Sequence, residues 1–75
     1  MTAIVYLNTG WGSAQQHGGY LRIHPPHGGP PTDVAPVAGR LVLFQSRSVE
    51  HEVLPAWRTR WAVSAWLPSR AAFAA

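Results

Sequence analysis

The sequence predicts an all-β fold, either a β-sandwich or a jelly roll, on two observations. The first is that β-branched, aromatic and other apolar residues gather in six short runs, a composition typical of strands. The second is that glycine, proline, asparagine and serine separate these runs at short intervals, as they do in turns. No segment shows a convincing helical repeat of apolar residues, so no helix is expected among the strands.

Six strands are expected, and alternation assigns their side chains to faces. In the first run Ile4 and Tyr6 share one face, because successive strand residues point to opposite sides. The run Arg40–Gln45 is apolar on both faces, which predicts a central strand. The expected strands cover residues 2–7, 20–24, 33–36, 40–45, 49–54 and 58–66.

The remaining segments are expected to be connectors and a tail. Residues 25–31 read Pro-Pro-His-Gly-Gly-Pro-Pro, which excludes both a helix and a central strand and indicates an exposed loop. His24 and His27 lie close together there and are a candidate metal site, although unliganded histidines are common in such loops. Residues 1–67 are expected to form the domain, and residues 68–75 a tail that is either a helical turn or disordered.

Length and composition limit the function classes. A chain of 75 residues holds one small domain, and the absence of cysteine excludes disulfides and thiolate metal sites. The net charge of +3 comes from arginines scattered along the chain, whereas nucleic-acid binding usually requires a clustered basic patch. No apolar run is long enough for a membrane span and no signal peptide is recognised. We therefore expect a cytoplasmic protein that binds neither nucleic acid nor membrane.

The stretch from His51 to Trp66 carries most of the functional information. Its pattern predicts two strand-like runs joined by the short turn Pro55–Trp57, that is, a hairpin. In the second run Arg60, Ser64 and Trp66 share one face. A guanidinium on an apolar strand is costly to bury unless it binds a carboxylate or phosphate. On these residues alone, a salt-bridged arginine and a surface histidine on an ordinary hairpin remain the simpler alternative.

The wider pattern resembles the prolyl 4-hydroxylase-like branch of the Fe(II)- and 2-oxoglutarate-dependent dioxygenases. The motif His-Glu-Val-x-Pro is present from His51, and Arg-Trp-Ala-Val-Ser-x-Trp follows from Arg60 with the family's spacing of nine residues. Thr-Ala-x-x-Tyr-Leu-Asn and Gly-Gly-x-Leu-Arg are also similar to family strands. These further matches lie at residues 2–8, 18–23, 34–36 and 39–46.

The resemblance implies a fold, cofactors and site residues. The fold would be part of a double-stranded β-helix, a jelly-roll or cupin-like architecture of two facing sheets. The cofactors would be Fe(II) and 2-oxoglutarate, with ascorbate as a further candidate. His51 would be a metal ligand and Arg60 would bind the distal carboxylate of 2-oxoglutarate. Other cofactor-binding residues implied by the resemblance are Tyr6, Leu21, Ser64 and Trp66; no catalytic residue is assigned.

One part of the family's site is missing from the sequence. Its other two iron ligands come from a His-x-Asp motif, and no His-x-Asp or His-x-Glu occurs in these 75 residues. Glu50 and Glu52 flank His51, but strand alternation places them on the opposite face. The chain is therefore expected to be a fragment of such an oxygenase, from the C-terminal part of the domain, and inactive alone.

The resemblance also predicts which strands lack a neighbour. The chain would supply the third to eighth strands of the eight-stranded core, which leaves the His51 and Arg60 strands as open edges. Open edges promote pairing with other strands, so we expect an edge-strand dimer or a complementing segment as a partner. A peptide or protein substrate is expected only for the intact domain.

Two other function classes stay open. The chain could be a non-catalytic interaction module derived from this fold, or a cupin-like β domain that binds another small molecule. Titration with 2-oxoglutarate, with and without Arg60→Ala, is the experiment that separates these three.

Overall fold

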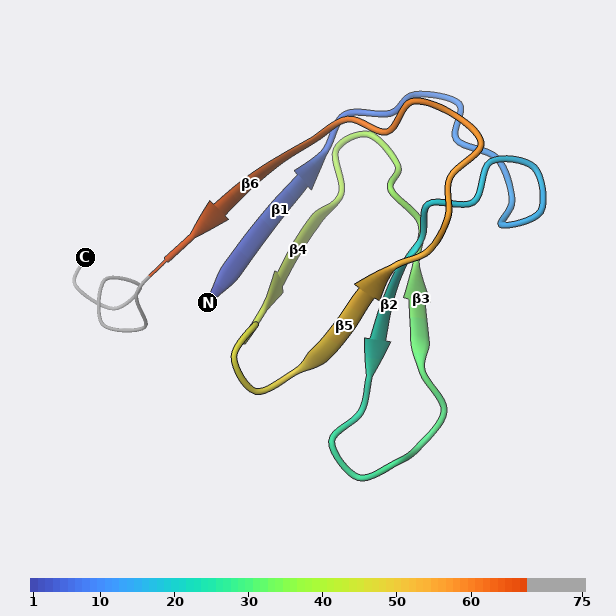
Figure 1. The fold of residues 1–75 in the computed structure, drawn as a ribbon. Helices are drawn as coiled ribbons and strands as arrows, with labels where there is room; N and C mark the ends of the chain where they lie inside the picture. Colours follow the sequence, from blue (N-terminus) through green and yellow to red (C-terminus); the bar gives the residue numbers. More distant parts are fainter. Residues whose placement is uncertain (68–75) are drawn as a thin grey trace.

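The computed structural model describes residues 1–67, which form six strands and no helix (Figure 1). The strands build two antiparallel sheets of three strands each. The predicted all-β class is confirmed, and the two sheets are consistent with part of a jelly-roll sandwich. The strands are β1 (Thr2–Tyr6), β2 (Leu21–His24), β3 (Thr32–Val34), β4 (Leu41–Phe44), β5 (Glu50–Val53) and β6 (Ala62–Trp66).

The first sheet has the strand order β4-β1-β6. Ile4 lies opposite Val42 on one side and Ser64 on the other, so these three residues share a face with Tyr6. We call this the inner face, because Tyr6 on it is buried. The outer face of the same sheet has only apolar side chains along the paired strands. Its large members, all partly or mainly exposed, are Val5, Leu41, Leu43 and Val63.

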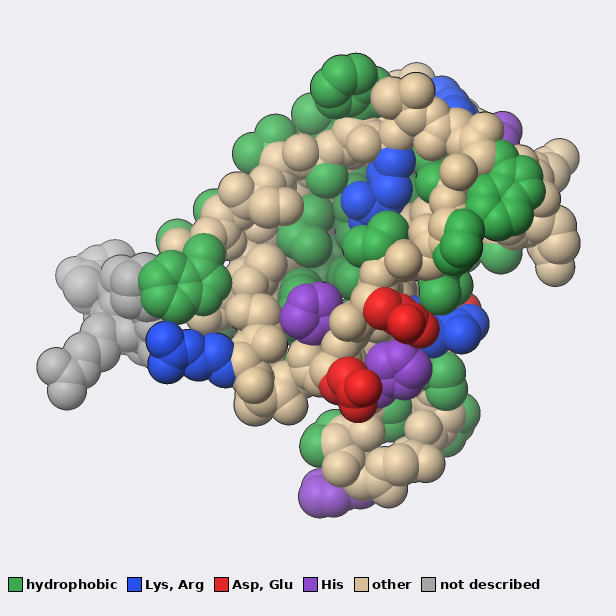
Figure 2. Space-filling model, in the orientation of Figure 1, with side chains coloured by type: hydrophobic (Ala, Val, Ile, Leu, Met, Phe, Trp, Pro, Cys, Tyr) green, Lys and Arg blue, Asp and Glu red, His purple; other side chains and the backbone are tan. Residues whose placement is uncertain are grey.

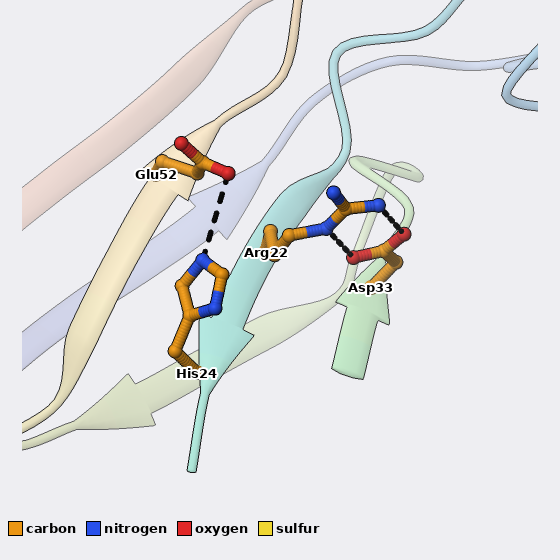
Figure 3. A network of polar contacts seen from close by, with 4 residues as sticks. All are labelled: Arg22, His24, Asp33 and Glu52. Carbon is orange, nitrogen blue, oxygen red and sulfur yellow. Dashed lines mark hydrogen bonds and ion pairs between the residues drawn. The ribbon is translucent and has the colours of Figure 1, made fainter. Parts of the chain in front are cut away.

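The second sheet has the strand order β3-β2-β5, and its two faces differ in polarity. Leu21, Ile23 and His51 share the inner face, which holds the buried Leu21. The outer face is charged (Figure 3). There Arg22 Nε and Nη2 donate to Asp33 Oδ1 and Oδ2 at 2.8 and 2.9 Å, and His24 Nε2 lies 3.5 Å from Glu52 Oε1.

The core between the sheets is small. Tyr6 and Leu21 are 0% and 1% exposed, and Asn8 is 4% exposed. Figure 2 shows hydrophobic side chains lining the space between the sheets, with acidic and histidine side chains over the second sheet. Every residue of β5 and β6 is exposed, because each of these strands lies at the end of its sheet within residues 1–67. The expectation that both are edge strands is confirmed.

The hairpin predicted for the stretch from His51 to Trp66 is wrong. β5 pairs with β2 and β6 pairs with β1, so the two strands belong to different sheets. The segment between them is too long for a tight turn and crosses from one sheet to the other at one end of the molecule (Figure 1). β6 also begins only at Ala62, which leaves Arg60 in the crossing segment rather than in the strand.

The prediction of a central strand at residues 40–45 is also wrong. β4 pairs only with β1 and lies at the edge of the first sheet in the described part of the chain. Its apolar outward residues Leu41 and Leu43 are more than half exposed. An apolar pattern on both faces of a strand describes its side chains. It does not predict how many neighbouring strands pair with it. The third strand is displaced as well: it covers Thr32–Val34 instead of residues 33–36, because Pro36 cannot donate to a ladder.

Residues 68–75, predicted to be a tail, lie outside the described residues. Within residues 1–67 there is no helix of the length and apolarity that crossing a membrane requires.

Candidate functional site

Two segments that are distant in sequence meet where the chain crosses between the sheets. Gly18 and Ala56 form an isolated antiparallel bridge. The amide of Gly19 donates to the carbonyl of Pro55 at 2.8 Å, and that of Trp57 donates to the carbonyl of His17 at 2.8 Å. These bonds hold the first part of the crossing segment against residues 17–19, the stretch that leads into β2.

Asn8 fixes the next part of the crossing segment. Its Nδ2 donates to the carbonyl of Pro36 at 2.7 Å and to that of Trp61 at 3.0 Å, while its Oδ1 accepts from the amide of Trp61 at 2.7 Å. The buried amide thus uses both its donor and its acceptor, as buried polar groups must to avoid a desolvation cost. Because Trp61 is held, the preceding residue Arg60 is directed toward the interior.

Arg60 is the central residue of the candidate site. Its Nε donates to the carbonyl of Gly19 at 2.8 Å and its Nη2 donates to the hydroxyl of Tyr6 at 3.2 Å. The guanidinium carbon lies 5.1 Å from the centre of the Tyr6 ring, within the range of a cation–π contact. Two residues from two segments, Gly19 and Tyr6, therefore hold one half-buried cation in one orientation.

The Tyr6 phenol is kept neutral by its surroundings. Burial raises the pKa of Tyr6 above its ordinary value of 10, and the nearby Arg60 charge and its hydrogen bond offset only part of this. The hydroxyl oxygen accepts from Arg60, which leaves the phenol proton free to be donated to an added ligand. Arg60 and Tyr6 together thus present two kinds of donor to an anion.

Arg60 has no carboxylate partner among residues 1–67. The ion pairs in this part of the chain join Arg22 to Asp33 and His24 to Glu52, on the outer face of the second sheet. The Nη1 of Arg60 makes no hydrogen bond to the described residues. A half-buried guanidinium with a free donor, beside a neutral phenol, is suited to a planar carboxylate.

His51 lies on the inner face, where its ring packs edge-on against Phe44 at 4.7 Å between centroids. Its Nδ1 is 2.8 Å from the carbonyl oxygen of Val49. Since a carbonyl oxygen can only accept, Nδ1 is the donor in this contact, which leaves Nε2 as the ring nitrogen available to a metal. This is the arrangement of a metal-binding imidazole that is oriented by a backbone carbonyl. Glu52 lies opposite Arg22 on the outer face, so it points away from His51 as predicted.

The other predicted site residues are spread along the inner faces. Leu21 is buried at the start of β2, two residues after Gly19. Ser64 lies opposite Ile4 on the inner face. Trp66 lies opposite Thr2 at the far end of β6 from Arg60; it is 60% exposed and has the Arg47 guanidinium 5.8 Å from its ring. The structure therefore brings Arg60 and Tyr6 into contact, and places Trp66 at the opposite end of the strand.

Sequence reasoning missed two residues that shape this site. Gly19 supplies the carbonyl that binds Arg60, and a Cβ on it would come within 3.2 Å of the Arg60 side chain and 3.1 Å of Trp11. Asn8 positions the residue after Arg60. In the sequence, the Gly18-Gly19 pair indicates only a turn before a strand. Its further signal is the doubling of glycine, which often marks a close approach of backbone to side chains.

The described residues do not form a complete metal site. No group of three histidine, cysteine or acidic side chains could hold one ion within residues 1–67. Of the predicted site residues, only His51 has a side chain suited to binding iron. A single imidazole does not make a non-haem iron centre, which uses two histidines and a carboxylate.

Comparison with known proteins gives the same family that the motifs suggest. Residues 1–68 match the model of the 2OG-Fe(II) oxygenase superfamily. The chain is 45% identical over 67 residues to prolyl hydroxylase EGLN3 of Mus musculus, covering 88% of this chain and 28% of the relative. It is 43% identical over 67 residues to hypoxia-inducible factor prolyl hydroxylase of Caenorhabditis elegans, covering 88% of this chain and 9% of the relative. The chain thus spans less than a third of the relatives it matches.

Proposed function

Because the chain belongs to the 2OG-Fe(II) oxygenase superfamily, we propose that it carries the 2-oxoglutarate-binding part of a prolyl hydroxylase-type site. Arg60 and Tyr6 bind the distal carboxylate of the cosubstrate. His51 contributes one ligand of the iron centre, and the remaining ligands come from outside the described residues. Hydroxylation by the intact site is coupled to oxidative decarboxylation of 2-oxoglutarate.

One observation carries this proposal: the Arg60 guanidinium is oriented by Gly19 and Tyr6 but has no acidic partner among residues 1–67. A carboxylate placed between Nη1 of Arg60 and the Tyr6 hydroxyl would receive a charge-assisted hydrogen bond and a neutral one. The neutral, buried phenol favours this because it adds a donor without adding a competing negative charge.

Leu21, Ser64 and Trp66 have supporting roles in this proposal. Leu21, buried on the inner face, packs against the methylene chain of the cosubstrate. Ser64 lines the pocket from β6, opposite Ile4, and Trp66 bounds the same face at the far end of the strand from Arg60. Ascorbate serves only as a reductant for the intact enzyme.

The substrate class follows from the relatives. Those compared above are named prolyl hydroxylases. We infer that the intact site acts on a prolyl side chain in a peptide or protein, and that this chain supplies the cosubstrate half of it.

The test is isothermal titration of 2-oxoglutarate into the wild-type chain and two arginine variants. Arg60→Ala should weaken binding of 2-oxoglutarate at least tenfold, because the distal carboxylate loses its cation. Arg58→Ala is the matched control: it removes the same charge two residues away. Arg58 donates to the carbonyls of Thr9 and Gly10 and lies over Trp11, so it does not face Tyr6.

Each outcome decides between the function classes. Equal losses in both variants would mean that only net charge matters and would overturn the proposed site. Binding of 2-oxoglutarate but not of its 5-methyl ester supports recognition of the distal carboxylate by Arg60. No binding of either compound by the wild type would instead favour the interaction module, and tight binding of both would favour a different small-molecule site.

A further inference from the structure

We propose that Trp11 is a positioning residue of the candidate site: its indole fixes the Gly18–Gly19 peptide group and thereby the direction of the Arg60 guanidinium. The observation behind this proposal is a hydrogen bond of 2.8 Å from Trp11 Nε1 to the carbonyl of Gly18. The effect on 2-oxoglutarate rests on the function proposed above, whereas the effect on Arg60 itself does not.

Three successive carbonyl oxygens, those of residues 17–19, are each bound by a different donor. The first accepts from an amide of the crossing segment at 2.8 Å, the second accepts from Trp11, and the third accepts from Arg60 Nε at 2.8 Å. Trp11 thus binds the carbonyl directly before the one that orients Arg60.

The peptide group between Gly18 and Gly19 is held at both of its polar ends. Its carbonyl accepts from Trp11, and its N–H donates to the carbonyl of Pro55 at 2.8 Å. Both glycines have a positive φ, 64° and 69°. Since glycine populates positive and negative φ about equally, rotation of this peptide group is opposed little by the backbone itself. The two hydrogen bonds therefore select the observed orientation.

The bond to Pro55 is not sufficient for this. A single hydrogen bond tolerates a broad range of angles, so without Trp11 the φ of Gly19 would vary more widely. The Gly19 carbonyl lies beyond that torsion and would spread with it, which would loosen the bond to Arg60. The buried Gly18 carbonyl would also lose its partner.

The indole also borders the stem of Arg60. A Cβ on Gly19 would lie 3.1 Å from Trp11 Cζ2 and 3.2 Å from Arg60 Cδ. The ring and the arginine methylenes therefore lie on the same side of Gly19, and the ring limits where those methylenes can pack.

The indole is itself held, so it acts as a fixed donor. The His17 ring packs edge-on against it with 5.6 Å between centroids, and the Arg58 guanidinium carbon lies 5.2 Å from its ring. His17 is held in turn, since its Nδ1 accepts from the amide of Gly12 at 2.6 Å. Arg58 is exposed, and Arg58→Ala leaves the hydrogen bond of Trp11 in place, so that variant remains a control for charge.

The first measurement is the exchange of the Arg60 Nε–H with water, followed by NMR. Trp11→Phe keeps an aromatic ring and removes the donor to Gly18. The matched control is Trp57→Phe, because Trp57 bonds to His17 through its backbone and its side chain is 65% exposed. We expect exchange about fivefold faster in Trp11→Phe, as the loss of one hydrogen bond implies, and no change in Trp57→Phe. Unchanged exchange in Trp11→Phe, or equal acceleration in both variants, would overturn the proposal.

Titration of Tyr6 separates lost orientation from a loosened fold. Burial raises the pKa of Tyr6, and Arg60 lowers it. If Trp11→Phe releases only Arg60, the pKa of Tyr6 rises above its wild-type value. If the variant instead opens the core, hydration brings this pKa down toward 10. Carbon NMR of labelled tyrosine distinguishes Tyr6 from Tyr20, and a lowered pKa would assign Trp11 a packing role and refute the proposal.

Affinity for 2-oxoglutarate tests the consequence for the site. Trp11→Phe should weaken binding about fivefold, and Trp57→Phe should leave it unchanged. A wild-type chain that binds no 2-oxoglutarate would refute the proposed function, while the exchange and titration measurements would still decide the role of Trp11.

A substitution that preserves shape covers a Trp11→Phe variant that does not fold. A synthetic chain with benzothienylalanine in place of Trp11 keeps two fused rings and has sulfur instead of the indole N–H, so it cannot donate. Exchange of the Arg60 Nε–H should again be about fivefold faster. Exchange at the wild-type rate in this chain would show that the hydrogen bond to Gly18 does not position Arg60.

Discussion

The Tyr6 hydroxyl is a single group whose titration can be measured. Its pKa is raised by burial, so in the folded state it stays neutral at pH values where an exposed phenol ionises. The interaction with Arg60 lowers the pKa but does not reverse the effect of burial. The same neutral phenol would serve the carboxylate site as a donor.

This predicts how stability depends on alkaline pH. Because the folded-state pKa lies above the unfolded value of 10, the stability that Tyr6 contributes is complete below pH 10. It is lost as the pH rises from there through the folded pKa. Urea denaturation between pH 9 and pH 11, at fixed protein concentration, should show the free energy of unfolding falling more steeply in the wild type than in Tyr6→Phe. Identical slopes would contradict the assignment.

Among the structural elements, the segment between β5 and β6 decides whether the site exists. It carries Pro55, Trp57 and Arg60 past the end of β1, and it is held by Gly18 and Asn8 rather than by a strand of its own. Positioning of the guanidinium therefore depends on loop contacts, which local hydrophobic patterns do not encode.

A glycine pair tests this dependence. Gly18 and Gly10 have nearly the same positive φ, 64° and 63°. A Cβ at Gly18 would collide with the carbonyl oxygen of Pro55, whereas one at Gly10 would meet open space. Gly10→Ala should cost about 1 kcal/mol for the left-handed backbone alone, and Gly18→Ala about 3 kcal/mol or more. Chemical denaturation measures both; a smaller cost for Gly18→Ala than for Gly10→Ala would show that the bridge to Ala56 is unimportant.

On the scale of the whole molecule, the proposed cosubstrate half-site is not accompanied by a complete metal site among residues 1–67. His51 is the one residue on the described inner faces with the arrangement of a ligand, and no three-residue metal group exists within residues 1–67. We therefore predict that the isolated chain does not decarboxylate 2-oxoglutarate.

The assay measures decarboxylation with Fe(II), ascorbate and 2-oxoglutarate against a blank without protein. Turnover should equal the blank, and His51→Ala should leave it unchanged. Activity above the blank that is lost in His51→Ala would disprove this prediction, since it would mean that the chain completes an iron site by itself.

The sequence predicted the positions of the strands well and the pairing between them less well. Strand positions follow from local composition, so all six strands were found within a few residues. The two errors concern pairing: β5 and β6 separate into different sheets, and β4 is at an edge. Pairing depends on contacts between distant segments, which alternation does not report.

The candidate site shows the same division. The family motifs were sufficient to select Arg60 and Tyr6, and the structure brings them to 3.2 Å. The supporting contacts of Gly19 and Asn8 could not be predicted, because both join segments that are distant in the sequence. The local pattern does not distinguish a glycine carbonyl or a turn asparagine that makes such a contact from one that does not.

The central position of β1 affects how the protein is made. Thr2 lies opposite both Phe44 and Trp66, so β1 is synthesised before either of the two strands that pair with it. At about 5 to 20 residues per second, roughly 3 to 12 seconds pass between the synthesis of β1 and that of β6. Contacts of such long sequence separation also close slowly after release. During that interval the apolar strand Thr2–Tyr6 is accessible to other nascent chains, and binding by a chaperone on the ribosome would favour correct folding over aggregation.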